Sequence, residues 1–186
     1  ERAAMQHLFA PKVFSPARYA AYLGGLYPVY SALEAQLERH RDHPLIGPLA
    51  RPELARTAAI EQDLATLCGS VGPPLPSCSA ARYAARINVV GQDAPLLLIA
   101  AIYTRYLGDL YGGQLLKAQI QRHLQLADNQ GVQSLLFPQI LDLAAFRTRF
   151  RAHLNELDLP SPVVGDLIRE TLDSFAMSQA LFESLS

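Results

Sequence analysis

The sequence predicts an all-α fold, a helical bundle in a single domain. Its 186 residues can bury one sizeable core without disulfides or metals. Helix start and stop signals recur along the chain, whereas it has no alternating β-branched runs, internal repeats or low-complexity tracts. Half of the residues are hydrophobic, yet no apolar run approaches the ~20 residues that cross a bilayer.

A Ser-Pro pair predicts that the first well-marked helix begins at Ser15 and runs to about Arg39, because serine caps helices and proline suits their first turn. Three residues near the middle of this segment are expected to bend or break it: Gly24, Gly25 and Pro28.

The remaining elements follow from the same signals. The polar, Pro-containing stretch 40–48 is expected to be a loop. Helices are expected at about 52–67, at 79–90 with a stop at Gly91, from 93–95 to about 128, from a cap at Asp142 to about 157, and from a Ser-Pro start at Ser161 to the C-terminus.

The segment 103–114 carries most of the functional information. It reads Tyr-Thr-Arg-Tyr-Leu-Gly-Asp-Leu-Tyr-Gly-Gly-Gln, a helical pattern that nevertheless contains three glycines. Three helical glycines together cost about 3 kcal/mol relative to alanine. Gly108 and Gly112 are four residues apart and share one helix face, with Asp109 beside it. A bare helix face beside a carboxylate suits a flat ligand that lies against the backbone.

This segment resembles the distal-helix signature of the heme oxygenases. The resemblance covers nearly the whole chain, because further segments appear in family order: Tyr27–Glu34, Glu61–Leu64, Phe137–Pro138 and Leu181–Glu183. It implies a helical bundle of the heme oxygenase type over residues 1–186. It also implies an enzyme that cleaves heme at a meso carbon to biliverdin, carbon monoxide and ferrous iron. Oxygen and electrons from NADPH, through a reductase or a ferredoxin, would drive the reaction, and a phytochrome is a candidate acceptor of the bilin.

The resemblance assigns the catalytic residues to the distal side of the heme. The helix at Gly108 would bend bound oxygen toward one meso edge, and Asp109 would hold an ordered water that supplies a proton. Tyr30, Tyr83 and Arg105 would join Asp109 in a hydrogen-bonded chain through ordered water. Without the resemblance, these three residues could equally be buried amphipathic residues with satisfied polar tips.

The resemblance also assigns contacts with heme, to Tyr103, Thr104, Gly108, Gly112, Gly113, Arg147, Arg151, Phe175, Ser178 and Phe182. Arg147 and Arg151 are four residues apart on one helix face, which by spacing alone describes a solvated surface. The resemblance makes them partners of the two heme propionates.

Two positions depart from the family pattern. Phe175, Ser178 and Phe182 form one inward stripe, which by spacing alone indicates core. The family typically has asparagine at the position of Ser178, so any hydrogen bond from the shorter serine to the distal network is expected to need a water. Tyr111 replaces a residue that is usually small, and it either faces away from the heme or narrows the pocket.

The histidine that binds heme iron in this family is expected upstream of Glu1, so the N-terminal part of the first helix is expected to be missing from this sequence. By the resemblance, Glu1 aligns with a family Glu that follows the ligand by about one turn and is expected at the heme site, and Met5 and Phe9 align with pocket-lining positions. His7 is an alternative ligand, although it lies on another face of that helix. A chain that natively lacks the upstream histidine would favour a heme-binding or sensor relative without turnover.

Composition and charge argue against several other classes of protein. The net charge of −1 predicts no electrostatic attraction to nucleic acid or to an anionic membrane. Cys68 and Cys78 are too few for a disulfide framework or a zinc site, and the start of the chain does not resemble a signal peptide, so a cytoplasmic protein is expected. A thiaminase-like helical enzyme remains an alternative, against which the Gly-Asp-x-x-Gly-Gly pattern and the arginine pair argue.

Overall fold

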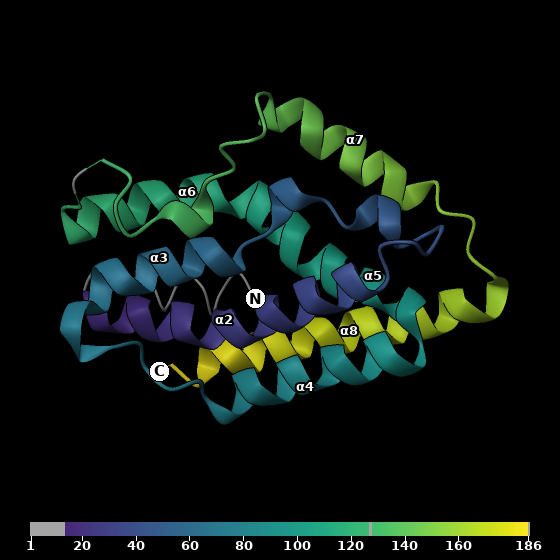
Figure 1. Cartoon of the computed structure of the whole chain (residues 1–186), viewed down its shortest axis with the longest axis horizontal. Helices are drawn as coiled ribbons and strands as arrows, with labels where there is room; N and C mark the ends of the chain where they lie inside the picture. Colours follow the sequence, from purple (N-terminus) through teal and green to yellow (C-terminus); the bar gives the residue numbers. More distant parts are fainter. Residues whose placement is uncertain (1–13, 127, 186) are drawn as a thin grey trace.

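The computed structural model describes residues 14–126 and 128–185, and it confirms the all-α prediction (Figure 1). The α-helices of these residues are α2 (Pro16–Arg39), α3 (Thr57–Cys68), α4 (Cys78–Asp93), α5 (Leu98–Ile102), α6 (Gly108–Leu124), α7 (Leu143–Asn155) and α8 (Ser161–Glu183). Helix α2 packs against α3 and α4, and α8 packs against α4 and α5. Figure 1 shows α7 at the edge of the bundle, and its Phe150 is buried in the shared core cluster.

Helix α2 begins as predicted, because the Ser15 side chain accepts a hydrogen bond from the Arg18 backbone N–H at 3.2 Å. The helix is not broken in its middle, however, and continues through Pro28 to Arg39. Gly24 instead allows another segment of the chain to approach α2 closely. A Cβ at this position would lie only 3.0 Å from Cγ of Pro74, so the absence of a side chain lets the Pro-rich loop between α3 and α4 pack on α2.

Helix α3 begins later than predicted. Residues Pro52–Leu54 form a separate 3₁₀ turn, and the α-helix starts at Thr57. A carboxylate oxygen of Glu34, on α2, accepts hydrogen bonds from the backbone N–H groups of Arg56 at 2.6 Å and Thr57 at 3.1 Å. The cap of this helix therefore comes from another helix rather than from the neighbouring residues.

Helix α4 does not stop at Gly91 as predicted but continues to Asp93. A Cβ at Gly91 would lie 2.6 Å from Cγ and Cδ of Gln36 on α2. The Gln36 side chain is buried, and its amide donates to the Asn88 side chain at 3.0 Å. The glycine thus allows α2 and α4 to approach each other closely, and it does not end the helix.

The long glycine-bearing helix is a composite. It begins with a 3₁₀ turn, Pro95–Leu97, continues through α5 and a π-helical turn, Tyr103–Leu107, and then becomes α6. A π-turn shifts the hydrogen-bond register of a helix and often occurs at functional sites. Here it coincides with the first five residues of the segment that the sequence singled out.

The last two helices differ in how they start. Asp142 caps α7 as predicted, because its carboxylate accepts from the Ala145 backbone N–H at 2.9 Å. Ser161 does not cap α8, since it is already the first helical residue and Pro160 occupies the cap position. The Pro160 carbonyl accepts from the backbone N–H of Val163 at 2.8 Å.

The core surrounds α2. Tyr19, Val29 and Leu33 of this helix are fully buried, and residues of α3, α4, α5 and α8 complete the same apolar cluster. None of the helices in the described part of the chain is long and apolar enough to cross a membrane.

The close approach at Gly91 predicts opposite effects for two Gly→Ala substitutions in helices. Gly91→Ala should lower the free energy of unfolding by about 1–2 kcal/mol, because the new methyl group displaces the buried Gln36 side chain. Gly165→Ala on α8 is the control, since a Cβ there meets nothing within 4 Å, and it should gain up to about 1 kcal/mol of helix propensity. Denaturant unfolding measures both; equal stabilisation by the two substitutions would refute this account of Gly91.

Candidate functional site

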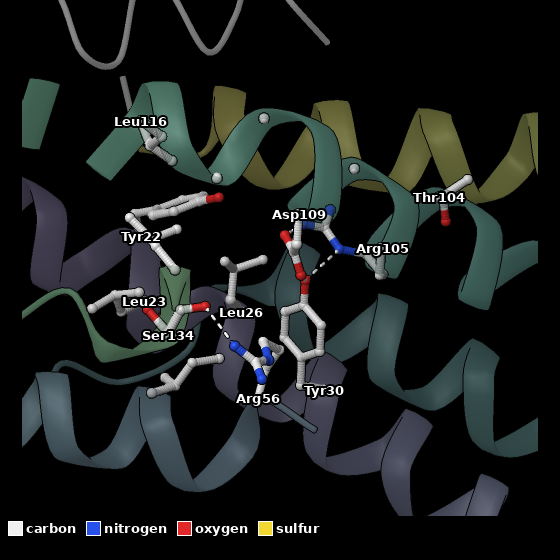
Figure 2. Close-up of a pocket in the computed structure, with 15 residues that line it drawn as sticks. Tyr22, Leu23, Leu26, Tyr30, Arg56, Thr104, Arg105, Asp109, Leu116 and Ser134 are labelled. Carbon is white, nitrogen blue, oxygen red and sulfur yellow. Dashed lines mark hydrogen bonds and ion pairs between the residues drawn. The ribbon is translucent and has the colours of Figure 1, made fainter. Parts of the chain in front are cut away.

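A buried arginine joins three parts of the fold (Figure 2). Arg105, on the π-turn, is 4% exposed. Its Nε donates to the Tyr30 hydroxyl of α2 at 3.3 Å, and its Nη2 lies 3.9 Å from Oδ1 of Asp109, at the start of α6. The Tyr30 hydroxyl in turn donates to the Asp109 carboxylate. A buried guanidinium, a phenol and a carboxylate thus form one set through direct contacts, whereas the family resemblance implied a chain through ordered water that also included Tyr83.

Burial and neighbouring charges shape the protonation of this set. Burial raises the pKa of Tyr30 well above its usual value, and the Asp109 charge raises it further, although Arg105 opposes both. Burial alone would lower the pKa of Arg105, but the adjacent Tyr30 and Asp109 outweigh it and raise that pKa. Arg105 therefore stays charged and Tyr30 stays a neutral donor across the physiological pH range.

Ser178 binds Arg105 directly, and the prediction that it needs a water was wrong. Nη1 of Arg105 donates to the Ser178 hydroxyl at 3.0 Å. Ser178 is almost completely buried where α8 packs beside the π-turn. This close packing brings the backbone of α8 near enough for the short serine side chain to reach the guanidinium.

Tyr83 belongs to a neighbouring cluster of hydroxyl groups. Its hydroxyl lies 2.5 Å from Oγ of Ser174 and 3.3 Å from Oγ1 of Thr104, and these two oxygens are 2.6 Å apart. The Thr104 hydroxyl donates to the Ala100 carbonyl at 2.9 Å. This cluster links α4 and α8 to Thr104, the residue that precedes Arg105, and so it holds the π-turn in position.

The glycines of α6 leave a helix face uncovered. A Cβ built at Gly108 or at Gly112 would meet nothing within 4 Å, so both positions adjoin open space. Gly113 points elsewhere, since its Cβ would lie 3.6 Å from the Leu135 carbonyl. The uncovered face and the predicted network border one cavity of about 80 Å³, which is large enough for several water molecules.

Sequence reasoning missed the opposite wall of this cavity. Arg56 is buried there, and its guanidinium donates to the backbone carbonyl of Ser134 at 3.3 Å (Figure 2). It also donates to the carbonyls of Leu54 at 3.0 Å and of Leu136. No local pattern marks this role, because the accepting carbonyls of residues 134 and 136 are distant in the chain. Ser174 was also missed, although it lies one turn before Ser178 and so extends the stripe already noted.

The aromatic residues assigned to the site divide into two groups. Tyr103 and Phe175 are 45% and 36% exposed, and their rings meet edge to face at 6.4 Å at the start of the π-turn. Phe182 is 2% exposed and stacks on Tyr22 at 5.4 Å. Tyr103 and Phe175 therefore present an accessible aromatic edge, whereas Phe182 supports the site from within the core.

Helix α7 places Arg147 and Arg151, the two arginines assigned to the site, in different surroundings. The guanidinium of Arg147 lies 5.0 Å from the ring centroid of Tyr111 on α6, and its Nη1 donates weakly to the Leu110 carbonyl at 3.4 Å. Arg151 is exposed. Tyr111 is half exposed and does not line the 80 Å³ cavity, so it faces away from that cavity and does not narrow it.

Four predicted positions lie outside the described residues: Glu1, Met5, His7 and Phe9. Across residues 14–126 and 128–185, no group of three or more His, Cys, Asp or Glu side chains could hold a metal ion.

Comparisons with known proteins are consistent across the chain. The family model described as heme oxygenase matches residues 1–184. Heme oxygenase 1 of Synechocystis sp. is 38% identical over 169 residues, which are 90% of this chain and 70% of that protein. Human heme oxygenase 1 is 39% identical over 169 residues, 88% of this chain and 58% of that protein. The chain therefore spans between about half and seven-tenths of the length of these curated relatives and of the mouse heme oxygenase 2.

Solved structures agree with the sequence comparison. The crystal structure of heme oxygenase-1 from Synechocystis in complex with heme aligns with a TM-score of 0.91 at 34% identity, covering 98% of this chain and 83% of that one. The heme oxygenase of Leptospira interrogans aligns with a TM-score of 0.90 at 30% identity, covering 98% and 92%.

The buried phenols predict a delayed alkaline titration. Burial raises the pKa of Tyr19, Tyr30 and Tyr106 above the usual value of 10.0, so these three of the eight tyrosines should ionise only as the protein unfolds. Because these pKa values are raised in the folded protein, the fold favours the neutral phenols. Their contribution to the free energy of unfolding is fully present below the pKa of an unfolded tyrosine, about 10, and is lost as the pH rises through the pKa values of the folded protein. Absorbance at 295 nm follows the ionisation of the phenols.

The Tyr30→Phe substitution should remove about one phenol from the step that accompanies unfolding. Tyr111→Phe, which removes a half-exposed phenol, is the control for a Tyr→Phe change as such. If Tyr30→Phe instead reduced only the titration of the folded protein, the phenol of Tyr30 would not be buried as described.

Proposed function

This chain belongs to the heme oxygenase family, and from that premise we propose that it binds heme against the uncovered face of α6 and cleaves it with oxygen to biliverdin, carbon monoxide and ferrous iron. Membership of this family sets the thiaminase-like alternative aside. The chain spans only part of its longer relatives, so the activity is proposed from its own residues as well.

One observation carries the proposal: the open face at Gly108 and Gly112 adjoins the hydrogen-bonded set of Arg105, Tyr30 and Asp109. Side chains at the two glycines would stand where a flat ring would lie, and each glycine costs about 1 kcal/mol in a helix. Such a cost is retained where a ligand must approach the backbone closely. The residues present therefore fit a planar macrocycle.

Residues of this chain would hold the water that supplies the proton for the reaction and would help to transfer that proton. Tyr30 donates to the Asp109 carboxylate and Arg105 lies close to it, so both hold the carboxylate at the edge of the cavity that has room for water. A carboxylate in this place can orient a water and pass its proton toward the open glycine face. Heme, when bound, supplies the iron at which oxygen reacts and the ring that is cleaved.

The remaining site residues would orient the ring. Tyr103 and Phe175 offer an exposed aromatic edge at the start of the π-turn, against which an apolar ring edge can pack. Thr104 is tied into the hydroxyl cluster and holds the π-turn in place. Arg147, which lies over Tyr111 of α6, and Arg151, one turn further along α7, would pair with the propionate carboxylates.

The proposal includes partners. Oxidative cleavage of heme consumes electrons that amino-acid side chains do not supply, so a separate donor is needed, a reductase that uses NADPH or a ferredoxin. A bilin-accepting protein such as a phytochrome is the proposed consumer of the product. We place the reaction in the cytoplasm, which the free Cys68 and Cys78 support, because oxidising compartments favour paired cysteines.

A hemin titration of the protein at its native length tests the proposal, followed by ascorbate in air while the visible spectrum is recorded. A sharp Soret band that decays into the broad red absorption of biliverdin would establish the enzyme. A Soret band that persists would indicate the alternative, a heme-binding relative without turnover. Absence of a specific Soret band would overturn heme binding altogether.

Asp109→Ala should lower biliverdin formation by about 10²–10⁴-fold, because it removes the group that holds and passes the proton, and turnover should shift toward peroxidase-like chemistry. Product spectra with hemin and ascorbate measure this change. Asp158→Ala, at an exposed position in the loop after α7, is the matched control and should behave as the unmodified protein. A normal biliverdin yield from Asp109→Ala would contradict the role assigned to this carboxylate.

A further inference from the structure

Two buried hydroxyl groups lie at the cavity wall that Arg56 and Ser134 form. Tyr19 of α2 is fully buried, and Ser134, in the 3₁₀ turn Gln133–Leu135, is 6% exposed. Within the described part of the chain, neither the Tyr19 Oη nor the Ser134 Oγ has a hydrogen-bond partner. A buried hydroxyl group without a partner destabilises a fold, and buried polar groups in proteins are therefore commonly bound to ordered water.

A buried carboxylate lies beside these two hydroxyl groups. Asp63 of α3 is fully buried, and its two oxygens accept from the backbone N–H groups of Gln133 at 2.7 Å and Ser134 at 2.8 Å. Burial raises the pKa of Tyr19 and the charge of Asp63 raises it further, whereas the Ser134 hydroxyl opposes the rise. Burial also raises the pKa of Asp63, and the Ser134 hydroxyl opposes that rise too. The Ser134 hydroxyl is thus close to both groups.

The cavity of about 80 Å³ reaches this set of oxygen atoms. Ser134 lines the cavity directly, and so does Tyr22, whose ring is stacked on that of Tyr19 at 6.4 Å. In Figure 2, Tyr22 and Ser134 lie to the left of Asp109 and Arg105. A water needs roughly 10–15 Å³ of space and two to four polar partners. The cavity offers the space, and the two hydroxyl groups and the buried carboxylate offer the partners.

We propose that the hydroxyl groups of Tyr19 and Ser134 bind an ordered water, which makes a second water site on the wall opposite the glycine face. The Tyr19 hydroxyl donates to this water, and the Ser134 hydroxyl accepts from it. The second hydrogen of the water faces the cavity. Asp63 holds the site in shape, because it binds the backbone of the turn that carries Ser134.

The second water site has a use in heme cleavage, and this part of the inference rests on the proposed function. A flat ring on the face of Gly108 and Gly112 covers the open side of the cavity, so water beside Asp109 is no longer replaced from that side. A water held by Tyr19 and Ser134 lies in the same enclosed space. It is a reserve from which the water beside Asp109 is replaced while the ring is bound.

A crystal structure of the ligand-free protein at a resolution that shows ordered water tests the site directly. Density for a water within about 2.5–3.2 Å of both the Tyr19 Oη and the Ser134 Oγ is the expected result. If ordered water were seen elsewhere in the interior and none between these two oxygens, the proposal would be overturned.

Thermal unfolding of the ligand-free protein provides a second test, through the sign of the shift in Tm. Tyr19→Phe and Ser134→Ala should each lower Tm by about 2–4 °C, because each change deprives the water of a partner and leaves the other hydroxyl unpaired. The double variant should lower Tm by little more than either single change, because the first change already releases the water. If the two hydroxyl groups bind no water, each substitution removes an unpaired buried group and raises Tm, which would overturn the proposal.

A matched control separates a shared water from two independent effects. Ser161, at the start of α8, is exposed, so Tyr19→Phe combined with Ser161→Ala should give additive shifts in Tm. Additive losses from Tyr19→Phe and Ser134→Ala as well would show that these two hydroxyl groups do not share one water.

The reserve role is tested with hemin and ascorbate. Ser134→Ala should slow the formation of biliverdin several-fold and leave the affinity for hemin unchanged, because Ser134 lies on the wall opposite the glycine face. An unchanged rate would overturn the reserve role. Should the unmodified protein fail to bind hemin or to form biliverdin, the proposed function and the reserve role would fall together, whereas the crystal structure and the unfolding cycle would still decide the water site.

Discussion

The buried charge of Arg105 is the constraint on which the rest of the site depends. A guanidinium that is 4% exposed destabilises the fold strongly unless its donors are satisfied. Its partners come from three places in the chain, Tyr30 on α2, Asp109 at the start of α6 and Ser178 on α8. Satisfying this one group therefore brings the three helices into a single arrangement. The same arrangement aims a carboxylate at the cavity beside the open glycine face, so the stability of the fold and the chemistry of the site rest on the same contacts.

The backbone around Arg105 deviates from a regular α-helix, and side chains stabilise the deviation. The π-turn Tyr103–Leu107 changes the register between α5 and α6, and the Thr104 hydroxyl binds the Ala100 carbonyl within it. Ser174 and Tyr83 hold Thr104 from α8 and α4. These hydroxyl groups form a fully buried polar cluster, which is rigid when all of its members are paired. The π-turn can thus carry the charged Arg105, while the hydrogen bonds of Thr104 hold the turn in place.

Polar groups from distant segments also build the far wall of the cavity. Asp63 of α3 accepts from the backbone N–H groups of Gln133 and Ser134 at 2.7 and 2.8 Å, and Arg56 donates to carbonyls of the same loop. Burial raises the pKa of Asp63, and the hydrogen bonds from the loop oppose that rise. A charged side chain that satisfies the backbone of a loop substitutes for regular secondary structure. The loop can therefore form a defined surface opposite the glycine face.

The sequence by itself determined what depends on neighbouring residues. The caps at Ser15 and Asp142, the all-α class and the shared face of Gly108 and Gly112 all follow from spacing within a few residues. Tertiary structure alone decided that Glu34 caps α3, that Gln36 packs on Gly91, that Ser178 reaches Arg105 directly and that Tyr111 takes up Arg147. Each of these contacts joins residues at least 22 positions apart. Helical periodicity shows which face a residue occupies, but the distance and orientation of the neighbouring helix arise only when the whole core packs.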